Sequence, residues 1–159
     1  MTGRLDGKVA VIVGAGSVGP GWGNGRATAV VFAREGAKVF AVDRSADALQ
    51  ETVEKAGGKI MTHLCDATDG KAVAGMAAAA IKAFGRIDIL VNVVGGSAAG
   101  GPVELSEEAW RGQLDYNLGT VFLACKHVLP VMVGQRSGAI VNISSTSGIR
   151  FSGAAQIGY

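Results

Sequence analysis

Apolar residues along the chain follow two alternating patterns, short runs rich in β-branched residues and longer stretches with helical spacing. Turn or cap residues stand at each change from one pattern to the other. The short runs predict five strands, at residues 8–13, 38–42, 59–64, 87–94 and 139–143. Several of these runs are apolar throughout, which is typical of parallel strands that are covered on both faces.

The longer stretches predict helices between the strands. The predicted helices cover residues 25–35, 45–56, 68–84, a region that begins at Ser106, and residues 118–132. We expect Pro130 to end or kink the last of them. No linker divides the chain. Strands that alternate with helices, joined by right-handed crossovers, predict one α/β domain with a doubly wound parallel sheet, and its ligand crevice lies at the carboxyl ends of the strands.

Composition and charge narrow the functional class. The 159 residues include 25 glycines, about twice the average share, and they gather in loops, which indicates close approach of the backbone to a ligand. A net charge of +2 without a basic cluster argues against a nucleic-acid partner. No unbroken apolar run has the roughly 18 residues of a membrane span, and the first residues lack a signal-peptide pattern. We therefore expect a cytoplasmic protein without a membrane partner.

The two cysteines do not indicate special chemistry. Cys65 and Cys125 stand far apart and have no CxxC or Cys/His ligand spacing. Small semi-buried thiols of this kind usually behave as ordinary apolar side chains. We expect neither a disulfide nor a metal site.

A glycine-rich segment at residues 14–25 lies between the first predicted strand and the first predicted helix. That is the position of a dinucleotide-binding turn. Glycines there allow positive φ and close contact with a pyrophosphate, and the amide groups at the helix start favour its negative charge. The segment predicts that residues 1–159 form a single dinucleotide-binding domain of the Rossmann type.

Asp43 ends the second predicted strand, 18 residues after Gly25. A carboxylate at that position accepts hydrogen bonds from the adenosine ribose hydroxyls and repels a 2′-phosphate, which favours NAD over NADP. Arg44, the next residue, is able to pair with a phosphate, so NADP stays the less favoured alternative.

These residues and several later motifs resemble the short-chain dehydrogenase/reductase family over residues 8–159. The glycine turn of that family, TGxxxGxG, is similar to residues 14–17 joined to residues 23–25 across an insertion at 18–22. Cys65 to Ala67 resemble the adenine-contacting segment after the third strand, and Asn92 to Gly95 resemble a degraded NNAG motif. This resemblance, together with the position of Asp43 at a strand end, predicts the residues that contact the cofactor. They are Gly14, Ser17, Gly23, Asn24, Gly25, Asp43, Arg44, Cys65, Asp66, Ala67, Asn92 and Gly95.

The same resemblance implies a catalytic set. Asn117 matches the catalytic asparagine of the family, Ser145 the serine that orients the substrate oxygen, and Tyr159 the tyrosine that acts as acid and base. The spacing from serine to tyrosine is one residue longer than usual, so Ser144 and Ser147 stay alternatives to Ser145. The implied reaction is hydride transfer between nicotinamide C4 and a carbon that bears a hydroxyl or carbonyl.

The family pattern also has a lysine four residues after the tyrosine, whereas this sequence ends at Tyr159. Members of the family are longer and add another helix, two strands and a substrate lid. We therefore expect the sequence to be the N-terminal portion of a longer enzyme, with its sheet truncated after the fifth strand. On its own we expect it to be inactive, because the terminal carboxylate raises the pKa of the neighbouring phenol.

The leading hypothesis is thus an NAD-dependent oxidoreductase whose complete form interconverts a small alcohol and a ketone. One alternative is an enoyl-thioester reductase, since that branch of the family also has a lengthened phosphate turn. The other is an NAD-binding module without turnover. The resemblance further implies a homo-oligomer, either a dimer or a tetramer, in which long helices such as residues 118–132 pair between subunits.

Overall fold

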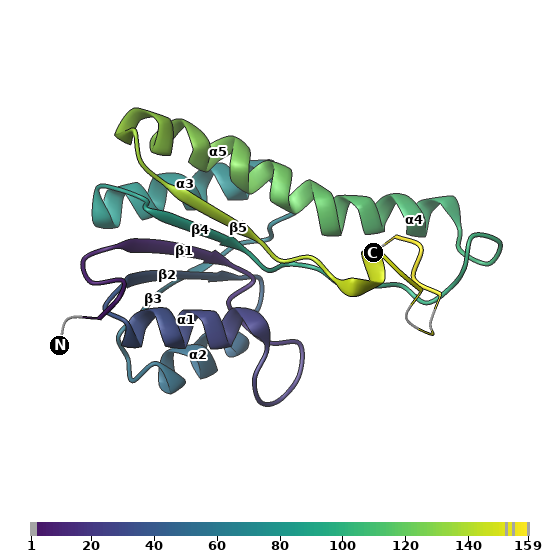
Figure 1. The fold of residues 1–159 in the computed structure, drawn as a ribbon, viewed down its shortest axis with the longest axis horizontal. Coiled ribbons are helices and arrows are strands. Elements are labelled where there is room, and N and C mark those ends of the chain that lie inside the picture. Colours follow the sequence, from purple (N-terminus) through teal and green to yellow (C-terminus); the bar gives the residue numbers. More distant parts are fainter. Residues whose placement is uncertain (1–2, 152, 154, 159) are drawn as a thin grey trace.

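The computed structural model describes residues 3–151, 153 and 155–158. Its strands are β1 (Val9–Val13), β2 (Lys38–Asp43), β3 (Met61–Leu64), β4 (Ile89–Asn92) and β5 (Ala139–Asn142). All four pairings are parallel, and the strand order is β3-β2-β1-β4-β5 (Figure 1). This order confirms the doubly wound sheet. The winding reverses between β1 and β4, which places a ligand crevice at their carboxyl ends.

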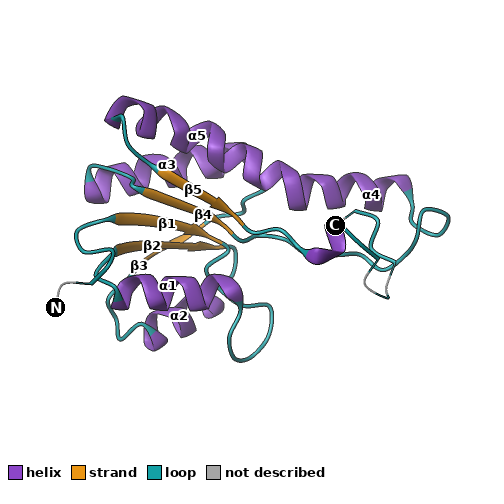
Figure 2. Cartoon of the chain, in the orientation of Figure 1, coloured by secondary structure: helices purple, strands orange, loops and turns teal. Residues whose placement is uncertain are grey.

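Helices cover both faces of the sheet (Figure 2). They are α1 (Asn24–Arg34), α2 (Ala46–Lys55), α3 (Gly70–Phe84), α4 (Glu107–Leu114), the π-helical turn η1 (Asp115–Gly119), α5 (Thr120–Gln135) and the 3₁₀ turn η2 (Thr146–Gly148). The helices α1 and α2 lie on one face, and α3 and α5 on the other. The helices α4, η1 and α5 form one long rod that extends beyond the strands (Figure 1).

The residues of β1 show why this strand is apolar throughout. Val11 and Val13 pack in the cluster that α3 and α5 cover, whereas Ala10 and Ile12 pack in the cluster beneath α1 and α2. Successive side chains of a strand point to opposite faces. All five residues of β1 are therefore buried, as the continuous apolar run predicts.

Polar side chains set several helix starts. Ser45 Oγ accepts the N–H of Ala48 at 3.2 Å, and Ser106 Oγ caps α4 in the same way. Asp69 caps α3 through the N–H of Lys71, so this helix begins at Gly70 and not at residue 68. Side-chain caps of this kind satisfy donors that the first turn of a helix leaves free.

Pro130 was expected to end or kink its helix, and the first of these two outcomes does not occur. The helix α5 continues through Pro130 to Gln135. Proline removes one backbone hydrogen bond, at a cost of about 3 kcal/mol. Val128 and Met132, on either side of it, are both buried against the sheet, and this packing outweighs the loss.

Asp88 fixes the amino-terminal edge of the sheet, opposite the crevice. Its buried carboxylate accepts the N–H of Val9 at 2.9 Å and pairs with Arg86 at 2.6 Å. Burial raises the pKa of Asp88, but hydrogen bonds from Arg86 and Val9 and the charges of Arg86 and Lys8 lower it by more, so the net pKa lies below its ordinary value. The ionised carboxylate thereby joins β1 to the turn that precedes β4.

Candidate functional site

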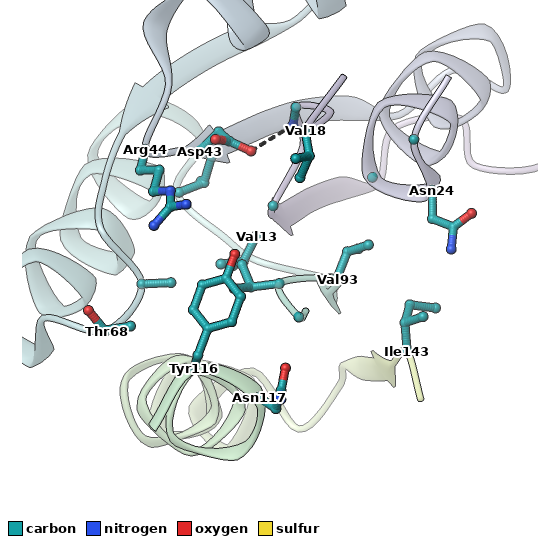
Figure 3. A pocket seen from close by; sticks show the side chains of 18 of the residues that line it. Val13, Val18, Asn24, Asp43, Arg44, Thr68, Val93, Tyr116, Asn117 and Ile143 are labelled. Carbon is teal, nitrogen blue, oxygen red and sulfur yellow. Dashed lines mark hydrogen bonds between the residues drawn. The ribbon is translucent and has the colours of Figure 1, made fainter. Parts of the chain in front are cut away.

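A cavity of about 840 Å³ lies at the carboxyl ends of the strands, where the winding reverses. Most of the predicted site residues line it, namely Gly14, Ser17, Gly23, Asn24, Gly25, Asp43, Arg44, Cys65, Asp66, Ala67, Gly95, Asn117 and Ser145. Figure 3 shows Asp43 and Arg44 facing Tyr116 and Asn117 across this cavity. Residues from all five strand ends therefore meet in one place.

The turn between β1 and α1 needs glycine at two positions. Gly14 has φ of +87°, a conformation that L side chains rarely adopt. A Cβ on Gly25 would stand only 1.7 Å from the carbonyl oxygen of Gly14. Gly23 starts α1 without a capping side chain, so the first amide groups of the helix keep their donors at the cavity. The turn is thereby suited to an anion.

Asp43 stands beside this turn. Its Oδ2 accepts the N–H of Gly16 at 2.8 Å, and its Oδ1 accepts the N–H of Ser45 at 3.0 Å. A carboxylate has about four acceptor positions, so two remain for hydroxyl donors. The Arg44 guanidinium lies over the Tyr116 ring, 5.7 Å from its centre, in a cation–π contact.

Tyr116 is a cavity residue that the sequence analysis missed. It lies in η1, directly before Asn117, and its ring lines the cavity opposite Arg44 (Figure 3). The only signal in the sequence is its position next to Asn117. Tyr116 and Asn117 both face the cavity because they lie in a π-helical turn. Local sequence does not predict such a turn.

The segment after β3 forms another wall of the cavity, with Cys65, Asp66 and Ala67. Hydrogen bonds from the N–H and the hydroxyl of Thr68 hold the pKa of Asp66 below its ordinary value. Burial, together with the charges of Asp66 and Asp69, raises the pKa of the Cys65 thiol. The thiol therefore stays neutral and is a poor nucleophile. Among the described residues, no three His, Cys, Asp or Glu side chains group as metal ligands do.

Asn92 does not line the cavity, although Gly95 does. Its side chain is 3% exposed and donates to Asn142 Oδ1 at 2.8 Å and to the sulfur of Cys125 at 3.9 Å. Its Oδ1 has no partner among the residues that the structure describes. Asn92 thus joins the ends of β4 and β5 from within the protein.

Asn117 joins three segments around the cavity. Its Oδ1 accepts the N–H of Gly96 at 2.9 Å, and its Nδ2 donates to the carbonyl of Gly96 at 2.9 Å and to that of Gly158 at 2.8 Å. It therefore holds the residue directly before Tyr159. Tyr159 itself lies outside the described residues.

Ser145 follows β5 and lines the cavity together with Ser144. The Ser145 Oγ accepts the N–H of Ser147 at 3.1 Å and so caps the turn η2. This bond uses a lone pair and leaves the hydroxyl hydrogen available to a ligand. Ser147, the third serine considered, is not among the residues that line the cavity.

Comparison with known proteins relates the whole chain to one family. Residues 8–159 match the family model described as short chain dehydrogenase. A 3-oxoacyl-[acyl-carrier-protein] reductase of Thermotoga maritima is 39% identical over 149 residues, which cover 92% of this chain and 58% of that protein.

Solved structures give the same result. A Burkholderia xenovorans protein assigned to the short-chain dehydrogenases/reductases is 57% identical, with a TM-score of 0.96 over 99% of this chain and 64% of its own. A 7α-hydroxysteroid dehydrogenase in complex with NADH and 7-oxo glycochenodeoxycholic acid is 33% identical, with a TM-score of 0.84 over 92% of this chain and 56% of its own. The chain thus spans less than two thirds of the length of these relatives.

Proposed function

The chain belongs to the short-chain dehydrogenase family of oxidoreductases, and we propose that it forms the cofactor-binding part of an NAD-dependent enzyme that interconverts a small alcohol and a ketone. The observation that carries this proposal is that the phosphate turn, Asp43, Asn117 and Ser145 all line one cavity. Nucleotide-binding groups and groups suited to carbonyl chemistry face the same space.

The turn fits a dinucleotide. Gly14 has a positive φ, Gly25 lets the start of α1 approach the Gly14 carbonyl closely, and the uncapped start of α1 supplies amide donors for a pyrophosphate. Asp43 keeps two acceptor positions for ribose hydroxyls and places a negative charge where NADP has its 2′-phosphate. These features favour NAD, and the 7α-hydroxysteroid dehydrogenase relative was solved with NADH.

The catalytic roles follow from the cavity and the family pattern. When bound, the nicotinamide ring exchanges a hydride with the carbon that bears the substrate oxygen. The Ser145 hydroxyl donates its hydrogen to that oxygen, since the N–H of Ser147 occupies only one lone pair and leaves the hydrogen available. Asn117 fixes the position of the residue before Tyr159 through the Gly158 carbonyl. Tyr159 takes the hydroxyl proton in oxidation and returns it in reduction.

We also propose a homo-oligomer that forms through the long helix. The helix Glu107–Gln135 contains an 18-residue window that is apolar enough by composition to span a membrane, but α5 packs with one side on α3 and β4. Its other side exposes Phe122 to 61% and Val133 to 70%. An apolar stripe on a helix that is half packed into a core suits a second copy of the same helix.

Calorimetry and turnover assays on the whole protein test the proposal. NAD should bind at least about tenfold more tightly than NADP, and a panel of small secondary alcohols should yield NADH. Asp43→Asn keeps an acceptor for the Gly16 N–H but removes the charge. It should therefore lower the ratio of the NADP to the NAD dissociation constant about tenfold. Asp47→Asn, an exposed acid in the first turn of α2, is the matched control.

Three results would overturn parts of this proposal. Tighter binding of NADP than of NAD would contradict the role of Asp43. Reduction of a crotonyl thioester without reduction of any ketone would favour an enoyl-thioester reductase. NAD binding without turnover of any alcohol or ketone would favour a binding module.

A further inference from the structure

Arg26 is a buried charge in the first turn of α1, with only 1% of its surface exposed. Its guanidinium pairs with Glu51 at 2.8 Å and donates to the Thr52 hydroxyl at 3.2 Å and to the Ala48 carbonyl at 3.3 Å. A fourth contact joins it to the Gly21 carbonyl at 2.5 Å. A buried guanidinium is costly unless its donors are satisfied. The Gly21 carbonyl, near the end of the inserted loop, is one of the four acceptors that satisfy this one.

Thr52 extends the network to the other end of the same loop. Its hydroxyl is fully buried, accepts the N–H of Arg26 at 3.2 Å, and shares its one hydrogen between the carbonyls of Ala15 at 3.0 Å and Ala48 at 2.9 Å. Ala15 lies before the insertion and Gly21 lies near its end. The inner side of α2 therefore holds both ends of the loop, one through Thr52 and one through Arg26.

Between these two anchors, the N–H of Gly16 donates to Asp43 and the Ser17 hydroxyl donates to the Gly19 carbonyl, whereas the tip of the loop is open. A Cβ on Gly19 or Gly21 would meet nothing within 4 Å, and the Val18 side chain is fully exposed. Figure 1 shows the loop ahead of α1 extending away from the sheet. Gly16 and Ser17, at its start, line the cavity. The path of the cavity wall thus depends on how the loop is anchored.

We propose that Arg26 is a positioning residue for the phosphate turn. It does not line the cavity, but through Gly21 and Thr52 it fixes the loop that presents Gly16 and Ser17 to the pyrophosphate. The proposal rests on the proposed dinucleotide-binding function. It predicts that loss of Arg26 weakens ligands that contain the pyrophosphate and spares ligands that lack it.

The test measures binding of NAD, ADP and adenosine to the whole protein by calorimetry. Arg26→Met, which keeps the apolar stem, should weaken NAD and ADP at least about tenfold, as expected for lost charge-assisted hydrogen bonds, and change adenosine less than about twofold. Arg26→Lys keeps one donor for Gly21 and should restore part of the ADP affinity. Arg111→Met removes an exposed arginine that pairs with Glu107 on α4, and it should change nothing.

Amide hydrogen exchange of the ligand-free protein provides a second readout. Arg26→Met should increase exchange at residues 16–22 and leave β1 protected. If this variant does not fold, Thr52→Val tests the same loop from its Ala15 end, with the same selective loss of ADP affinity. Unchanged ADP affinity and exchange, or equal losses for ADP and adenosine, would overturn the role of Arg26. A wild-type protein that binds neither NAD nor ADP would instead overturn the proposed function.

Discussion

The two sides of the sheet differ in how completely they are packed. On the side of the phosphate turn, α1 and α2 bury β2, and the turn is held by contacts within the described chain, although the edge strand β3 exposes Met61 to 45% and Leu64 to 60%. On the side of β5, Val141 is 44% exposed, and α5 presents Phe122 and Val133 to the outside. The phosphate turn is thus closed by contacts of its own with α1 and α2, whereas the side that bears Asn117 and Ser145 exposes apolar side chains on the long helix as well as on its edge strand.

The largest effect that we expect comes from Gly25, on the closed side. Gly25→Ala places a methyl carbon 1.7 Å from the Gly14 carbonyl oxygen, so α1 has to move away from β1. NAD affinity should fall about a thousandfold and stability by about 1–3 kcal/mol, as measured by calorimetry and urea denaturation.

Gly75→Ala is the matched control for this variant, because it adds the same methyl group to the exposed side of α3 with nothing within 4 Å. It should stabilise the protein by up to about 1 kcal/mol and leave NAD affinity unchanged. A Gly25→Ala protein that binds NAD normally would show that the turn is less tightly determined than its contacts indicate.

A somewhat smaller effect is expected on the open side. Phe122→Asp places a charge in the proposed contact between two α5 helices and should raise the dissociation constant of the oligomer about a hundredfold. Analytical ultracentrifugation measures this change. Val103→Asp alters another exposed apolar residue, in the loop before α4, and should leave the assembly intact. Equal sedimentation of both variants and the wild type would contradict pairing through α5.

The smallest expected effect concerns Asp88, where β1 meets the turn before β4. Folding lowers its pKa, so its ionised form stabilises the protein above the ordinary carboxyl pKa of 3.8, and this stabilisation is lost as the pH falls through the lowered value. Asp88→Asn should cost about 1–2 kcal/mol near neutral pH and flatten the decline in stability below pH ~4. Urea denaturation at several pH values measures both effects, with exposed Asp6→Asn as control. If Asp88→Asn leaves the pH dependence of the unfolding free energy below pH ~4 unchanged, other carboxylates determine that dependence.

The fold and much of the site could be predicted because their signals are local. The apolar run of β1 reports burial on both faces, and the glycines of the turn report a backbone conformation. Asp43 could be assigned from its position at the end of a strand, because parallel strands deliver their last residues to one edge.

The missed features depend on contacts between distant residues. Proline is a local signal for the end of a helix, but at Pro130 the packing of Val128 and Met132 in the core keeps the helix continuous. Arg26 looks like a solvated helix charge in the sequence, and only the approach of Glu51 and Thr52 shows that it is buried. Whether an asparagine such as Asn92 faces a ligand or a neighbouring strand is decided by the same kind of tertiary contact.

The Asn117 amide has a consequence for how the chain tolerates change. It meets both the N–H and the carbonyl of Gly96, as one peptide group meets another in a sheet, so it acts as a substitute for a strand neighbour. Neither aspartate, which lacks the donor, nor glutamine, which is longer, reproduces this pairing. The segment after β4 is thereby docked on the long helix at Gly96, and the N–H of Ala98, which donates to Gln113 of α4 at 2.8 Å, extends this docking into the following loop.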